Sequence, residues 1–142
     1  MHKGNKKSKT NIIVSIILIL IGTYIYVLYR QNIIFKNYLN LDHIYHYQDC
    51  NNNLIKYYLI YCLPDALWYF ALLLIQIALL RDHFLSRFLL IISMLLPFVL
   101  EILQLFNKIK GTFDIKDVYI YVITLLVILW KERKRLFLAY YN

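Results

Sequence analysis

The sequence is poor in carboxylates, glycine and cysteine, and these shortages exclude several kinds of site. Of its 142 residues only eight are acidic, three are glycine and two are cysteine. It holds no glycine-rich phosphate loop, no Cys-x-x-Cys pair and no Ser/His/Asp set of the kind that supports nucleophilic catalysis. No repeat or linker divides the chain, so we expect one membrane domain over residues 1–142.

Apolar side chains are in excess. Hydrophobic residues make up 61% of the chain and its mean hydropathy is +0.56, whereas soluble domains are about 45–50% apolar. Uncharged apolar runs cover residues 12–29, 66–80, 88–100 and 118–130. Because crossing a hydrocarbon core of about 30 Å takes about 20 helical residues, the three shorter runs need polar flanks to span. We predict an all-α integral membrane bundle of four transmembrane helices, near residues 11–30, 60–80, 85–106 and 113–131.

Basic residues flank the predicted spans instead of gathering on one face. The first span is preceded by Lys3, Lys6, Lys7 and Lys9, and the last is followed by Lys131, Arg133, Lys134 and Arg135. By the positive-inside rule we expect both termini, and the turn with Arg81 and Arg87, in the cytoplasm. Topology and anionic headgroups account for the net charge of +8, so we expect membrane lipids as partners and no nucleic acid.

The basic start, MHKGNKKSKTN, is typical of a signal peptide. The apolar run after it exceeds the roughly 7–15 residues of a signal-peptide core, and no A-x-A-like cleavage site follows. We therefore expect an uncleaved signal anchor that becomes the first helix.

Residues 31–58 form a long segment that this topology places outside the cell. Apolar residues recur there at helical spacing, at Ile34, Tyr38, Leu41 and Tyr45. The spacing predicts a short amphipathic helix on the outer membrane surface, ended by the asparagines at 51–53.

Three residues of this outer segment are weak candidates for a zinc or copper site: His43, His46 and Cys50. Polar residues on the wet side of an interfacial helix would give the same pattern, and no second His or Cys cluster completes four ligands. We therefore expect no cofactor. Cys50 and Cys62 would both lie outside, where a disulfide can persist; a bridge and two free thiols both remain open.

Five polar residues from three predicted spans share one depth. Each lies 14–17 residues from a charged residue at the inner boundary, which corresponds to roughly 21–25 Å above the cytoplasmic edge of the core. They are Asp65, Glu101, Gln104, Asp114 and Asp117. The sequence therefore predicts an acid layer in the outer third of the membrane.

Two interpretations of the acid layer are open. Intramembrane acids are costly and usually face a bundle interior or a wet cavity, which favours a functional pocket. Asp65, Asp114 and Asp117 also fall where helices start, so they can act as capping carboxylates that Glu101 and Gln104 meet by hydrogen bonds. Capping does not explain Glu101 itself, which lies near the C-terminal end of its span, where an anion is disfavoured.

Three motifs in order resemble the VanZ-like family, a group of small bacterial multi-span membrane proteins. The motifs are Pro64-Asp65-Ala66-Leu67-Trp68, then Glu101-x-x-Gln104, then Gly111-Thr112-Phe113-Asp114-x-x-Asp117. The resemblance covers residues 57–130. It implies a protein of the bacterial plasma membrane, linked to the cell envelope and to glycopeptide tolerance, and it adds Trp68 to the candidate pocket residues.

The chain departs from the family pattern at two places. Many relatives carry Arg where Gly111 stands, and an Asn-x-x-Gly pattern where this chain has Tyr121 and Thr124. If that Arg balances the acids in relatives, the same task would fall here to one of three lysines, Lys108, Lys110 or Lys116.

Three functions fit these residues. In the first, the acid layer and Trp68 form an outward-facing pocket for a lipid or envelope headgroup. In the second, Asp65, Glu101, Asp114 and Asp117 hold Mg²⁺ in an enzyme acting on lipid phosphates. In the third, intramembrane carboxylates couple ions or protons to transport, for which four spans without repeats would need a homo-oligomer. We favour the headgroup pocket, which requires no catalysis.

Overall fold

The computed structural model describes residues 2–29, 54–79, 84–110 and 112–141 of the chain. These residues form helices, apart from the turn at 106–110 and the irregular residues 112–114, and include no strand. The elements are α1 (His2–Tyr29), α3 (Leu54–Tyr57), a π-helical turn (Tyr58–Cys62), α4 (Leu63–Leu79), α5 (Phe84–Leu105) and α6 (Ile115–Tyr141).

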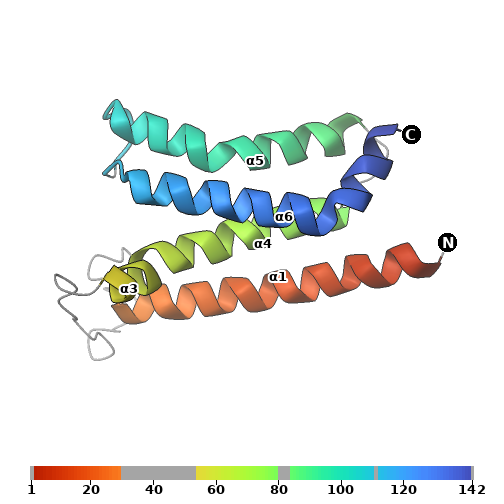
Figure 1. The fold of residues 1–142 in the computed structure, drawn as a ribbon, viewed down its shortest axis with the longest axis horizontal. Helices are drawn as coiled ribbons and strands as arrows, with labels where there is room; N and C mark the ends of the chain where they lie inside the picture. Colours follow the sequence, from red (N-terminus) through yellow and green to blue (C-terminus); the bar gives the residue numbers. More distant parts are fainter. Residues whose placement is uncertain (1, 30–53, 80–83, 111, 142) are drawn as a thin grey trace.

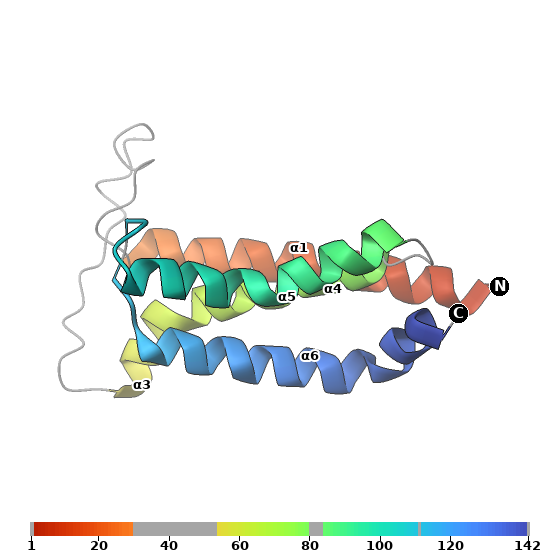
Figure 2. The same cartoon turned by 90° about the horizontal axis from the view of Figure 1, so that it is seen from above.

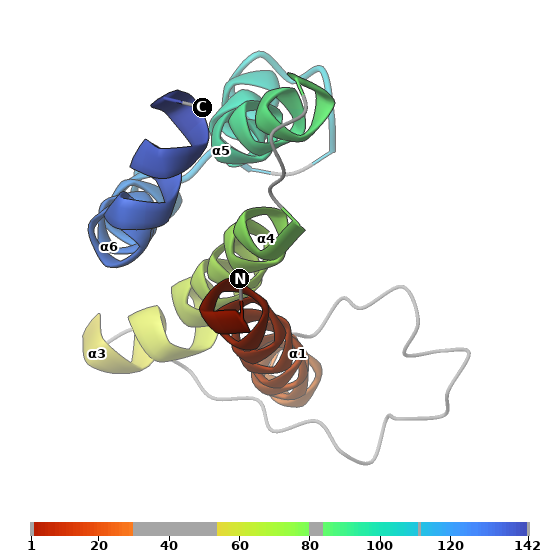
Figure 3. The same cartoon turned by 90° about the vertical axis from the view of Figure 1, so that its right-hand side faces the viewer.

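Helix α4 lies at the centre and contacts α1, α5 and α6 (Figure 3). Helices α1 and α5 run antiparallel to α4, and α6 runs parallel to it (Figures 1 and 2). One end of the bundle therefore holds the start of α1 and the end of α6. The other end, which we call the junction end, brings together the start of α4, the end of α5 and the start of α6.

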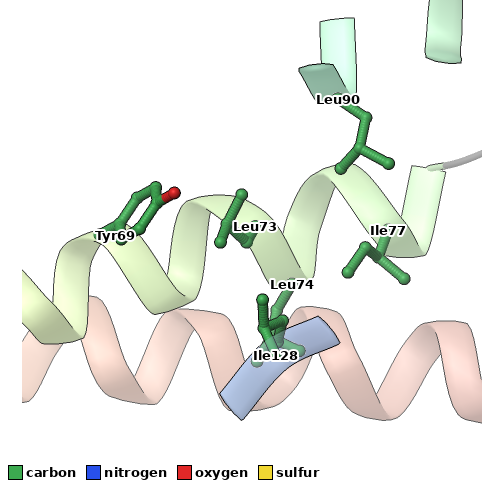
Figure 4. Packing of buried hydrophobic residues seen from close by; sticks show 6 residues of the cluster. All are labelled: Tyr69, Leu73, Leu74, Ile77, Leu90 and Ile128. Atoms are coloured by element: carbon green, nitrogen blue, oxygen red, sulfur yellow. The ribbon is translucent and has the colours of Figure 1, made fainter. Parts of the chain in front are cut away.

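The core is an apolar cluster around the middle and far half of α4 (Figure 4). Its members are Tyr69, Leu73, Leu74 and Ile77 of α4, Leu90 of α5 and Ile128 of α6. The Tyr69 hydroxyl donates to the backbone carbonyl of Met94 on α5 at 2.8 Å, which satisfies its one donor. In lipid such contacts stabilise through packing and hydrogen bonds, because lipid tails are as apolar as the helices.

Three segments are long and apolar enough to cross a membrane: Ser8–Tyr29, Tyr58–Leu79 and Leu85–Leu105. The outer faces of α1 and α5 carry many exposed large apolar side chains, such as Leu20 and Leu95. The all-helical fold and three membrane-length helices confirm that part of the sequence prediction.

Helix α6 lacks a comparably long apolar window among the described residues. Its uncharged run covers only residues 118–130, and charged residues border it on both sides. The helix also continues past residue 131, where we expected it to end, to Tyr141. A fourth crossing, and termini that face the cytoplasm, stay predictions. The predicted outer helix, which was expected to end at residues 51–53, lies outside the described residues.

Proline 64 does not start a new helix at the junction end. Helical structure runs without a break from Leu54 through the π-helical turn into α4, and Pro64 sits in the first turn of α4. The N–H of Leu63 donates to the carbonyl of Tyr58, five residues back, which is the π pattern. Proline has no N–H to donate to a helix, but the π-helical turn before it keeps the helix continuous. Asp65 therefore lies inside a continuous helix.

Candidate functional site

Helix α5 ends in a Schellman motif that fixes the last turn carrying Glu101 and Gln104. Asn107 has a positive φ of 53°, and its N–H donates to Gln104 O at 2.9 Å. The N–H of Lys108 reaches back to Leu103 O, also at 2.9 Å. Asn tolerates this left-handed position better than most residues, so α5 stops here and the chain turns toward α6.

Asp114 is the N-cap of α6. Its Oδ1 accepts the backbone N–H of Lys116 at 2.9 Å, and its carbonyl accepts the N–H of Asp117 at 3.0 Å. Its other carboxylate oxygen, Oδ2, accepts the hydroxyl hydrogen of Tyr57 at 2.8 Å. One side chain thus starts α6 and ties it to α3.

Lys116 is the cation of this cap. Its Nζ lies 3.9 Å from the centroid of the Tyr57 ring, a cation–π distance. Burial tends to raise the pKa of Asp114, but the Lys116 N–H, the Tyr57 hydroxyl and the Lys116 charge together lower that pKa below its usual value. Burial and the bond to Asp114 raise the pKa of Tyr57. Of the three lysines considered as counterions, Lys116 contacts the acid layer, whereas Lys108 and Lys110 are exposed.

Glu101 is buried, with 6% of its surface exposed, and joins α5 to the start of α6. Its Oε2 accepts the backbone N–H of Asp114 at 3.4 Å, a long and therefore weak bond. The Glu101 carboxylate also interacts electrostatically with Asp117, Asp114 and Asp65. The structure therefore brings all four acids into one neighbourhood, and capping accounts for part of Glu101 after all.

Asp117 lies beside the π-helical turn. The thiol of Cys62, fully buried and free, is hydrogen-bonded to the Asp117 side chain. This contact joins α6 to the chain just before Pro64. Cys50 lies outside the described residues.

A shallow groove opens beside the acids, between α4, α5 and α6. We call it the α4–α5–α6 groove; its volume is about 190 Å³. It is lined by Asp65, Trp68, Tyr69 and Leu72 of α4, Leu96, Pro97 and Leu100 of α5, and Tyr121 of α6. Asp65 is the one charged residue of this mostly apolar lining.

Aromatic rings form the walls of the groove. Tyr121 meets Tyr69 edge to face, with ring centroids 5.6 Å apart. The Trp68 ring packs against the Tyr26 ring of α1, with ring centroids 5.1 Å apart. Gly22 of α1 makes that approach possible: a Cβ on Gly22 would lie 2.9 Å from Trp68 Nε1 and 3.3 Å from the Pro64 carbonyl.

Most residues at the junction end and in the groove were candidates from the sequence, but their individual contacts were not predicted. Glu101, Asp114 and Asp117 hold the junction end, and Asp65 and Trp68 line the groove. Within the described part of the chain no side-chain hydrogen bond joins Gln104 to the other candidates. Four partners of these residues were not predicted: Tyr57, Cys62, Tyr69 and Tyr121. Neither the 14 tyrosines nor a lone buried thiol carries a sequence signal of what the side chain meets on another helix.

No metal-binding group emerges from the described residues, which contain no set of three or more His, Cys, Asp or Glu side chains arranged to hold an ion. The weak candidates His43, His46 and Cys50 lie outside those residues. The four acids therefore share a neighbourhood without forming a cation cage.

A second polar group lies at the opposite end and has no counterpart in the sequence analysis. Glu132 of α6 is fully buried, and its Oε1 accepts the Asn11 amide of α1 at 3.5 Å. Ser15 Oγ donates to the Asn11 carbonyl at 2.7 Å, and Ser8 Oγ donates to the Ala78 carbonyl of α4 at 2.6 Å. These contacts tie α1 to both α4 and α6.

Comparisons with known proteins identify no relative: no family model, no curated protein and no solved structure matches the chain.

Proposed function

We propose that this chain is a VanZ-like integral membrane protein of the bacterial cell envelope that binds a lipid or envelope headgroup. The observation that carries the proposal is the α4–α5–α6 groove, where Asp65 lies in an otherwise apolar, aromatic lining. A recessed acid beside lipid-facing side chains suits a molecule that is polar at one end and apolar at the other.

The VanZ-like assignment depends on the order of three motifs in the sequence. It is supported by their positions in the fold, at helix ends that lie close together. Pro64-Asp65 lies at the start of α4, Glu101 lies in the last turns of α5, and Asp114-x-x-Asp117 opens α6. Residues far apart in the sequence thus meet at one end of the bundle. Tyr121, one of the departures from the family pattern, supplies a wall of the groove. A link to glycopeptide tolerance belongs to the same proposal.

The orientation supports an outward-facing site. The start of α1 and the end of α6 both lie at the end of the bundle opposite the acids (Figure 1). Helix α6 carries Lys131, Arg133 and Lys134 there. Under the positive-inside rule that end faces the cytoplasm. The groove would then open toward the outer leaflet.

The transport hypothesis has less support. Below the acids, the apolar cluster of Leu73, Leu74, Ile77, Leu90 and Ile128 fills the centre of the bundle. Buried Ser93 on α5 returns its hydroxyl to its own helix, at Leu89 O. An apolar cluster therefore lies between the acid layer and the other end of the bundle.

Mass spectrometry of co-purified lipids tests the proposal. The wild type, Asp65→Asn and Asp82→Asn are purified identically; Asp82 follows α4 in sequence and receives the same chemical change. We expect at least one lipid species to be enriched on the wild type and on Asp82→Asn, and depleted several-fold on Asp65→Asn, because the groove loses its only charge. Identical lipid sets on all three proteins would contradict the proposal.

A further inference from the structure

The lining of the groove also indicates which headgroup it would take. Building on the proposed function, we propose that the α4–α5–α6 groove binds the N-substituted ammonium headgroup of a membrane amphiphile, with the alkyl chain leaving along α5. Three observations carry this inference: the size of the groove, the sign of its charge, and the kinds of groups that face it.

The volume limits the occupant to a small group. A cavity of about 150 Å³ accommodates a benzene molecule, so about 190 Å³ takes a headgroup of comparable size and no complete lipid. Leu96 and Leu100 line the groove and are also 42% and 41% exposed on the outer face of α5. A chain attached to the headgroup can therefore continue over these side chains into the surrounding lipid.

The charge near the groove selects a cation. Asp65 lies in the lining, and Glu101 interacts electrostatically with Asp65, Asp114 and Asp117. Lys116 donates its backbone N–H to Asp114, and its Nζ lies over the Tyr57 ring. An anionic headgroup such as a phosphate would meet the Asp65 carboxylate of the lining at short range, which is unfavourable in a medium of low dielectric constant.

The lining also has few donors to offer an anion. Two of its three side-chain donors point elsewhere: Tyr69 donates to Met94 O, and Trp68 Nε1 faces Gly22 of α1. The lining also carries three aromatic side chains, those of Trp68, Tyr69 and Tyr121. Aromatic rings and a carboxylate are the kinds of group that recognise quaternary ammonium ions. A primary ammonium needs acceptors for three N–H groups, whereas a methylated one needs contact area and charge.

Trp68 provides a reporter for the test. The chain has two tryptophans, and Trp130 is 74% exposed on α6, away from the groove. Replacing it by phenylalanine, Trp130→Phe, leaves Trp68 as the only indole. The emission of Trp68 is then followed in dodecyl maltoside micelles while dodecyltrimethylammonium, dodecylammonium or dodecyl phosphate is added.

We expect a saturable change in Trp68 emission with dodecyltrimethylammonium, a weaker one with dodecylammonium and none with dodecyl phosphate. In the same background Asp65→Asn should weaken the trimethylammonium response by about tenfold or more, because a desolvated carboxylate–cation contact is lost. Asp82→Asn should leave the response unchanged. Should Asp65→Asn not fold, Leu100→Phe narrows the groove without touching the charge and should abolish saturation.

The outcomes separate the two proposals. An Asp65-dependent response to dodecyl phosphate, with none to the ammonium probes, would overturn the ammonium assignment and leave headgroup binding standing. A trimethylammonium response unaffected by either Asp65→Asn or Leu100→Phe would overturn the assignment to this groove. In the mass spectrometry of co-purified lipids, identical lipid sets on the wild type and on Asp65→Asn would contradict headgroup binding itself.

Discussion

Asp114 and Glu101 bond the backbone at the junction of α5 and α6, while Asp65 faces an open groove. All three were placed in one layer from their distance to the inner boundary, because helical rise is regular. Their separate tasks could not be assigned from the sequence, since each depends on which backbone N–H or ring lies across from it on another helix. The structure shows capping by Asp114, whereas a functional pocket at Asp65 stays a proposal.

The N-cap at Asp114 leads to a stability prediction. Asp114→Ala removes the acceptor for the Lys116 N–H and for the Tyr57 hydroxyl, so we expect the free energy of unfolding to fall by about 1–2 kcal/mol. Asp114→Asn retains a capping oxygen and should lose less. Denaturation in detergent micelles, followed by circular dichroism, measures both; equal stability of Asp114→Ala and wild type would argue against the cap.

The lowered pKa of Asp114 gives that stability a pH dependence. A carboxylate with a lower pKa in the folded state stabilises the fold above its unfolded-state pKa of about 3.9, and the contribution is lost as the pH falls through the folded-state value. The difference in stability between the wild type and Asp114→Asn should therefore shrink in acid, in the same denaturation experiment. A difference that grew with acidification would contradict the bonding described for Asp114.

The positions of the long helices followed from the apolar runs, but their arrangement did not, and neither did several helix ends: α1 already begins at His2, where we expected a start near residue 11. A span that is apolar on all sides carries little information about which face packs, so the central place of α4 (Figure 3) was not predictable. The π-helical turn before Pro64 was not predicted either, because the proline indicated a helix start. Helix α6 was expected to end near residue 131, but its charged end, including buried Glu132, continues as helix to Tyr141.

The approach of α1 to α4 at Gly22 is testable at the level of these two elements. Gly22→Val inserts atoms where even a Cβ would lie 2.9 Å from Trp68 Nε1, and overpacking of this kind costs about 1–3 kcal/mol. We expect a lower unfolding midpoint and a changed Trp68 emission in the Trp130→Phe background. Thr23→Val, on the exposed face of α1, is the matched control, and equal effects of the two variants would speak against close packing at Gly22.

At the scale of the whole molecule, an apolar centre separates two polar ends. The junction end carries the acids and the groove, and the other end carries Asn11, Ser15 and Glu132 around the basic flanks. The sequence predicted the first end from depth alone. It did not predict the second, because Glu132 stands among charged residues that were expected to face water. The arrangement favours a binding site at one membrane face over a path across the membrane.

The most direct test of that claim is photo-crosslinking in the native membrane. A photoreactive diazirine amino acid of about the size of leucine, which does not narrow the groove, replaces Leu100 at the rim of the groove or, as a control, Leu126 on an exposed face of α6. After irradiation of cells, intact-protein mass spectrometry should show a defined lipid adduct at position 100 that disappears with Asp65→Asn. Adducts at position 126 should be mixed and independent of Asp65. An identical, Asp65-independent mixture at both positions would contradict a headgroup site in the groove.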